Sequence, residues 1–136
     1  MPLLSLGFVM IVVLFVWQWL RQQKRVQSYA EVFCALLQKN PGLRINYIDY
    51  TGCFYFNVVG QDEPFVYTRT GWSDTSPPPW LCNSFEGMSS GDVRRALRYL
   101  AEEVKDNPED HPLVYSVTSQ GWSLRLNAKE AQVIVA

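Results

Sequence analysis

The segment PLLSLGFVMIVVLFVWQWL, residues 2–20, is followed at once by the basic segment RQQKR, residues 21–25. No charged side chain occurs between Leu3 and Leu20. At a helical rise of about 1.5 Å per residue, this run reaches roughly 27 Å, close to the hydrocarbon thickness of about 30 Å. The sequence therefore predicts a transmembrane anchor over residues 1–21, followed by a small folded domain over residues 22–136.

The side chains at the C-terminal end of the run are typical of a membrane boundary. Amphipathic rings and long basic side chains collect where lipid meets water. Membrane lipid is therefore the first partner that the sequence predicts. The residues expected to lie at the interface are Trp17, Trp19, Arg21, Lys24 and Arg25.

Two other interpretations of the apolar run are a cleaved signal peptide and a buried core helix. A signal peptide begins with a basic region and ends at a small-x-small cleavage site. This chain begins Met-Pro-Leu-Leu, and no such site follows the run. A core helix that is hydrophobic all round is hard to accommodate in 136 residues. A membrane anchor is the interpretation that fits both flanks.

The flanking charges predict the orientation of the anchor. Lys and Arg near a span favour the cytoplasmic side, and here they all follow the span. We therefore expect a single-pass protein of the cell membrane, with the N-terminus outside and the domain in the cytoplasm. The odd number of cysteines agrees with a reducing compartment. The alternative is the reverse topology, with Cys53 and Cys82 bridged outside the cytosol.

The charge of the predicted domain limits its partners. Beyond the basic flank, nine Lys and Arg stand against thirteen Asp and Glu, which gives a net charge of −4. Nucleic acid and a broad anionic lipid surface both require a cationic field. We therefore expect no nucleic-acid partner and do not expect the domain to lie flat on anionic lipid.

Helical periodicity predicts two helices in the domain. Apolar residues spaced three and four apart indicate a helix over residues 22–39. Neither Gly nor Pro occurs between Phe8 and Asn40, so this helix is expected to continue directly from the anchor. A second helix is expected to start near the segment SSGD, residues 89–92, where a serine hydroxyl can cap free backbone N–H groups and Asp92 suits the positive helix end. It is expected to end at Asn107 and Pro108.

Alternating apolar and polar residues predict an antiparallel sheet. The fold class is therefore α+β, with two helices on one sheet in the order helix, three strands, helix, two or three strands. The segment 71–89 contains many turn formers and is predicted to be a long surface loop. The predicted strands are residues 43–50, 53–59, 65–70, 113–119 and 122–127, with 131–136 as a last strand.

No residue pattern predicts catalysis, a metal site or a cofactor. His111 is the only histidine, and a zinc ion or a general base needs partners. Cys34, Cys53 and Cys82 lack Cys-x-x-Cys spacing and are expected to be ordinary buried thiols. A Cys/His nucleophile pair, or three thiolates with His111, is the alternative.

Two groups of residues are candidates for binding a protein partner. Arg94, Arg95 and Arg98 form a cationic corner on the second helix, suited to an acidic partner or a phosphate. The structural alternative is a solvated helix face on which Arg98 pairs with Glu102. The second group is a preordered proline run beside a Trp anchor, or else a rigid loop with that Trp on its own core. Its residues are Pro77, Pro78, Pro79 and Trp80.

These features predict a non-catalytic accessory or assembly subunit of a larger complex, which presents its domain at the membrane for protein–protein interaction. The alternatives are a small membrane-tethered regulator or immunity factor and a thiol-dependent membrane-bound enzyme or sensor. The latter would use Cys53, Cys82 or His111. Nothing in the sequence specifies the oligomeric state.

Overall fold

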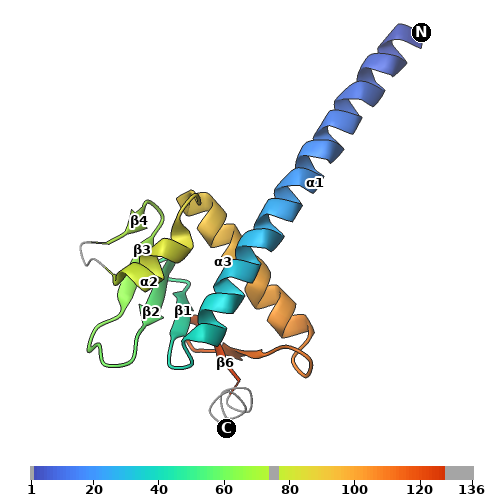
Figure 1. The fold of residues 1–136 in the computed structure, drawn as a ribbon. Coiled ribbons are helices and arrows are strands. Elements are labelled where there is room, and N and C mark those ends of the chain that lie inside the picture. The colour runs from blue at the N-terminus through green and yellow to red at the C-terminus, as the bar shows by residue number, and fades with distance from the viewer. Residues whose placement is uncertain (1, 74–76, 128–136) are drawn as a thin grey trace.

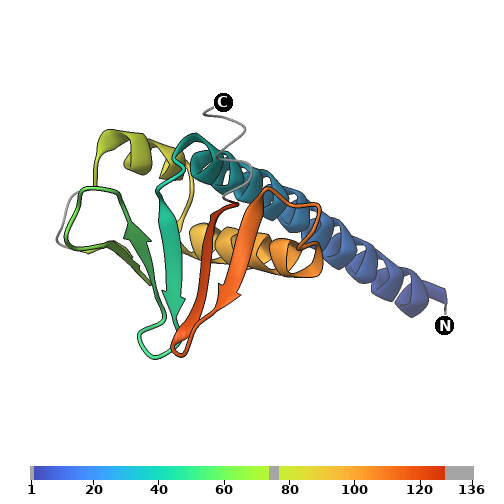
Figure 2. The ribbon, with the colours of Figure 1, turned by 90° about the horizontal axis from the view of Figure 1, so that it is seen from below.

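The structure, a computed structural model, describes residues 2–73 and 77–127. Helix α1 (Pro2–Lys39) runs without a break from the N-terminal end into a small α+β domain (Figure 1). Its C-terminal half packs beside α3 (Ser90–Asp106), and both helices cover the same face of an antiparallel sheet (Figure 2). The predicted fold class and the continuous first helix are confirmed. The predicted strand at 131–136 lies outside the described residues.

The sheet joins the two halves of the chain. Its described strands are ordered β4-β3-β2-β1-β6-β5, and every pair is antiparallel. The first and last of these described strands, β1 and β6, lie side by side, with Ile45 opposite Leu124 and Tyr47 opposite Trp122. The strands are β1 (Arg44–Ile48), β2 (Cys53–Asn57), β3 (Phe65–Thr68), β4 (Gly71–Trp72), β5 (Leu113–Val117) and β6 (Gly121–Leu126).

The core lies between the sheet and the two helices. Alternate residues of each strand point toward the helices, because successive side chains of a strand face opposite sides. Phe33 and Leu37 of α1, and Leu97 of α3, are fully buried against them. The fully buried strand residues are Ile45, Phe54, Phe56, Leu113 and Leu124.

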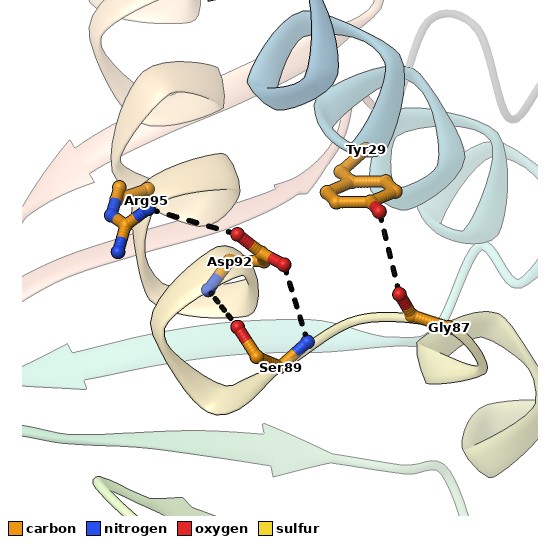
Figure 3. A network of polar contacts seen from close by, with 5 residues as sticks. All are labelled: Tyr29, Gly87, Ser89, Asp92 and Arg95. Carbon is orange, nitrogen blue, oxygen red and sulfur yellow. Dashed lines mark hydrogen bonds and ion pairs between the residues drawn. The ribbon is translucent and has the colours of Figure 1, made fainter. Parts of the chain in front are cut away.

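A capping box fixes the start of α3 within the predicted segment 89–92, with Ser89 as the capping serine. The Ser89 hydroxyl accepts a hydrogen bond from the Asp92 backbone N–H at 3.2 Å, and the Asp92 carboxylate accepts one from the Ser89 backbone N–H at 3.3 Å (Figure 3). Such a cap stabilises a helix by about 1 kcal/mol. Just before it, the Tyr29 hydroxyl donates to the carbonyl of Gly87 at 3.4 Å and ties this end of α3 to α1.

The prediction of a long surface loop over residues 71–89 is wrong. The segment contains β4, a short helix α2 (Pro79–Cys82) and a 3₁₀ turn η1 (Asn83–Phe85). Leu81 is fully buried, and the Phe85 ring packs 4.8–5.5 Å, centroid to centroid, from four other rings. The segment therefore closes the core beside β3 and β4. The rings around Phe85 are those of Phe33, Phe56, Tyr67 and Trp72.

Candidate membrane-proximal and partner-binding surfaces

The N-terminal half of α1 is an apolar rod exposed along its length. Its large apolar side chains from Leu6 to Leu20 are between 43% and 69% exposed. None of its most apolar stretch is buried inside the protein, and by length and composition α1 can span a membrane. The same helix becomes part of the core at Ala30 and Phe33, which are 1% and 0% exposed. One helix thus joins the exposed rod to the folded domain.

The five residues predicted at the membrane interface lie where the rod meets the domain. Trp17, Trp19, Arg21, Lys24 and Arg25 are all exposed. The Arg21 guanidinium lies 4.8 Å from the centre of the Trp17 ring, one helical turn earlier. A cation above an indole face is a favourable pair, and it keeps ring and charge at the same depth.

A groove opens between α1 and α3 where the rod meets the domain, and Trp19 lies at its edge. It has a volume of about 410 Å³ and receives side chains from one face of each helix. The Gln27 side-chain amide donates a hydrogen bond of 2.9 Å to the Tyr99 hydroxyl and holds the helices together there. The lining residues are Trp19, Gln22, Gln23 and Val26 of α1, and Arg95, Arg98, Tyr99 and Glu102 of α3.

The structure separates the three arginines of the cationic corner. Arg94 donates to the carbonyl of Gly52 and lies over the Phe54 ring, 5.6 Å from its centre. Arg98 donates to the Tyr47 hydroxyl at 3.3 Å, and its guanidinium lies 5.7 Å from the centre of that ring. Both arginines thus brace the hairpin of β1 and β2 against α3.

Arg95 makes a different polar contact from Arg94 and Arg98. Its side chain is 51% exposed and lines the groove, and it forms a 3.7 Å ion pair with Asp92. Among the described residues, this is the one ion pair between side chains. Arg98 donates to the Tyr47 hydroxyl and does not pair with Glu102, the partner that helical spacing favours. Within the cationic corner, Arg95 and Arg98 are therefore exposed and line the groove, and Arg98 also contacts Tyr47, whereas Arg94 is half-buried against the hairpin.

The proline run presents Trp80 from a rigid base. Pro79 is the first residue of α2, where its fixed φ and missing N–H fit a helix start. Leu81, the next residue but one, is fully buried and secures the turn, while Trp80 is 39% exposed. Trp80 borders a small hollow of about 180 Å³ next to Val59, which is 76% exposed. These two side chains form an apolar patch beside the α1–β1 turn.

The thiols and the histidine lie on different elements. Cys34 is on α1, Cys53 on β2 and Cys82 on α2, and all three are free. His111 accepts a hydrogen bond through Nδ1 from the Leu113 backbone N–H at 3.2 Å, so it helps to form the turn before β5. Within residues 2–73 and 77–127 no three His, Cys, Asp or Glu side chains are grouped as a metal site.

Burial changes the chemistry of one thiol. It raises the pKa of Cys34 above its ordinary value of 9.0, and the nearby carboxylates of Glu103 and Glu31 add to this effect. A thiol with a raised pKa is less often the reactive thiolate at neutral pH. The surroundings of Cys34 therefore make it a poor nucleophile.

Sequence reasoning missed the groove between α1 and α3. The apolar stripes of the two helices indicate that each packs on the core, but they do not indicate which polar residues meet at the crossing. Gln22 of α1 lies beside Tyr99 and Glu102 of α3, more than 70 positions later in the sequence, only because the two helices pack together. No family model, curated protein or solved structure matches this chain, so its function is argued from its own residues.

Proposed function

We propose that this chain is a single-pass, membrane-anchored, non-catalytic accessory or assembly subunit that presents its α+β domain at the cytoplasmic surface of the membrane. One observation carries the proposal. A single unbroken helix is exposed and apolar from Leu6 to Leu20 and forms part of the domain core from Ala30 onward.

The exposed rod is unfavourable in water. Apolar surface costs about 25 cal/mol per Å² when it is left in contact with water, and soluble monomers rarely expose a contiguous apolar patch of more than a few hundred Å². A core helix of a soluble protein hides such side chains, whereas none of this stretch is buried. Lipid is the environment that relieves this cost along the full length of the rod.

The orientation rests on the charges at the junction. Arg21, Lys24 and Arg25 are exposed on the domain side of the rod, and such cations favour the cytoplasmic side. The domain would then stand at a fixed height, because the helix that enters the core at Ala30 is the one that leaves the bilayer.

The apolar patch of Trp80 and Val59 supports a protein partner. Exposed aromatic anchors on a rigid base dominate many interfaces, since little conformational entropy is lost when they bind. The domain holds Trp80 in this way, between Pro79 and the buried Leu81. The patch adjoins the C-terminal end of α1. That end lies roughly 28 Å along the helix from Leu20, so a partner that docks there would contact the side of the domain away from the bilayer.

The proposal is tested first by location. The full chain, expressed with a reporter that is active only outside the cytoplasm fused after Ala136, should float with membranes, resist alkaline extraction and show no reporter activity. A chain that purifies without detergent, or an active reporter, would contradict the anchor or its orientation respectively.

The partner is tested by capture from native membranes. We expect Trp80→Ala to lose the proteins that co-purify with the wild-type chain, while Tyr50→Ala retains them. Tyr50 is a matched control, because it is an aromatic residue that is 97% exposed on the hairpin between β1 and β2. A strictly monomeric chain with no co-purifying protein would count against an accessory role.

A further inference from the structure

We propose that the groove between α1 and α3 binds the anionic headgroup of a membrane phospholipid. The inference rests on the proposed membrane anchoring and adds a specific ligand to it. It joins two sets of residues that the sequence keeps apart, the interface end of α1 and the exposed arginines of α3.

The position of the groove matches the depth of lipid headgroups. Its α1 side begins at Trp19, an interfacial ring at the end of the apolar rod, and continues through Gln22 and Gln23 to Val26. These residues follow the rod over about two helical turns, or roughly 10 Å. A groove at this level lies beside the polar layer of the bilayer and opens to it.

The charges of the groove favour an anion. Among the residues that line the groove, Arg95 and Arg98 contribute two guanidinium groups and Glu102 contributes the single carboxylate. The Asp92 carboxylate, which is 13% exposed and caps α3, lies 3.7 Å from Arg95. The domain as a whole is acidic, so this is a local exception on the side that faces the membrane. Anionic lipids attract juxtamembrane Lys and Arg, and the cationic residues at the start of the domain point to the leaflet where such lipids are enriched.

Both arginines have hydrogen-bonding capacity left for a phosphate. A guanidinium carries five N–H donors. Arg98 uses one nitrogen for the Tyr47 hydroxyl at 3.3 Å. The Arg95–Asp92 distance of 3.7 Å is well beyond the 2.7–2.9 Å that is typical of a strong charge-assisted hydrogen bond. The side-chain amides of Gln22 and Gln23 add neutral donors on the opposite wall.

The remaining walls suit the apolar part of a lipid. Trp19, Val26 and the Tyr99 ring line the groove next to the rod, so acyl chains leaving the headgroup would run along α1 into the bilayer. A soluble anion would gain nothing from these walls. The combination favours a phospholipid over free phosphate.

The test compares lipid retention by variants of the full chain. The chain is purified in mild detergent, mixed with equal amounts of phosphatidylglycerol and phosphatidylcholine, and examined by native mass spectrometry. We expect the wild-type chain to retain phosphatidylglycerol with about a fivefold preference, because two arginines opposed by one carboxylate leave one net positive charge, worth about 1 kcal/mol near a membrane surface. Excess inorganic phosphate should leave the preference unchanged.

Three variants locate the site. Arg95→Gln with Arg98→Gln should reduce the preference to within about twofold, since most of the electrostatic attraction is removed. Arg95→Gln alone should reduce it in part, and this exposed residue can be replaced without disturbing Tyr47. Arg44→Gln with Arg125→Gln removes the same charge from a cross-strand pair in the sheet and should leave the preference intact.

The outcomes are distinguishable. Equal retention of the two lipids by a wild-type chain that floats with membranes would overturn the headgroup site but not the anchor. Three further results would also overturn the headgroup site. They are an equal loss of the lipid preference in the control variant, displacement of the lipid by inorganic phosphate, and a wild-type dimer that the groove variants dissociate. A wild-type chain that does not float would overturn the anchor and the headgroup site together.

Discussion

Gly121 allows the two halves of the sheet to meet. A Cβ atom at this position would overlap the Tyr47 carbonyl oxygen and approach the Ile48 Cα at 3.3 Å, so only glycine lets β6 approach β1 this closely. We expect Gly121→Ala to lower the free energy of unfolding by about 3 kcal/mol, because the backbone of a central strand must shift. Urea denaturation followed by tryptophan fluorescence measures this.

The control for Gly121 is a glycine in open space. Gly87 has a φ of +78°, and nothing would lie within 4 Å of an added Cβ. Gly87→Ala should therefore cost only the backbone strain of the left-handed region, about 1 kcal/mol. Equal losses in the two variants would show that the contact with Tyr47 is not the reason for Gly121.

Cys34 should make the stability of the domain sensitive to alkaline pH. Its pKa is raised in the folded chain, so below 9.0 the thiol is protonated in both states and contributes nothing to pH dependence. Above 9.0 the unfolded thiol ionises while the folded thiol keeps its proton, so the free energy of unfolding falls as the pH rises. Denaturation midpoints between pH 8 and pH 10 should show this fall, and Cys34→Ala should reduce it. Above pH 10 the phenol of Tyr67, whose pKa is also raised by burial, adds a fall of the same sign.

At the scale of elements, the segment from α2 to η1 carries two aromatic residues with different roles, the buried Phe85 and the exposed Trp80. We expect Phe85→Ala to lower the free energy of unfolding by about 4 kcal/mol, because it empties the space between four rings. Trp80→Ala, five residues earlier, should cost less than about 1 kcal/mol, because its side chain is partly exposed. A reversed order in urea titrations would contradict this assignment.

The elements that the sequence predicted well are those with a local signal. Ser89 and Asp92 mark the start of α3 by capping chemistry that needs only neighbouring residues. The segment 71–89 has no period and many turn formers, so its burial could not be predicted. Phe85 is buried by rings from α1, β2, β3 and β4, and no local pattern reports such distant partners.

The continuity of α1 should hold the domain in one orientation. Gln22 is exposed between the rod and the first buried residue, Val26, so a proline there breaks the helix at a cost of about 3 kcal/mol without touching the core. We expect Gln22→Pro to broaden the distance distribution between spin labels at Val13 and Thr51, and Gln22→Ala to leave it narrow. Pulsed EPR on the chain in nanodiscs, with the native cysteines replaced, measures this. Equal widths would mean that the junction is flexible in the wild-type chain.

At the scale of the whole molecule, the rod alone should decide where the protein resides. We expect residues 22–136 to remain folded and soluble without detergent, whereas the full chain sediments with membranes. The double substitution Val12→Arg and Phe15→Arg should release the full chain from membranes, because each charge at the centre of the rod costs about 3 kcal/mol in lipid. Gln18→Arg, near the interface, should be tolerated. Sedimentation followed by immunoblotting distinguishes these cases. A full chain that stays in the supernatant would contradict the prediction.

The overall arrangement was only partly predictable. The alternation of β1 and β6 indicates two strands, but it does not indicate that they pair with each other across most of the domain sequence. The groove shows the same limit, because Arg95 and Trp19 are brought together by the way α1 crosses α3. The sequence predicted Trp19 as a membrane-interface residue and Arg95 as a partner-binding residue, but no local pattern related the two.

In the proposed membrane-anchored arrangement, the shared helix also fixes how the domain is rotated about the helix axis relative to the faces of the rod. Each residue of an α-helix advances the chain by about 100° and 1.5 Å. One residue inserted between Leu20 and Gln22 would therefore rotate the domain, with the α3 wall of the groove, by about 100° relative to the rod. Seven inserted residues would return the domain to within about 20° of its original orientation. A partner that contacts both the rod and the domain would therefore require one relative rotation of the two. The number of residues in the short junction determines that rotation.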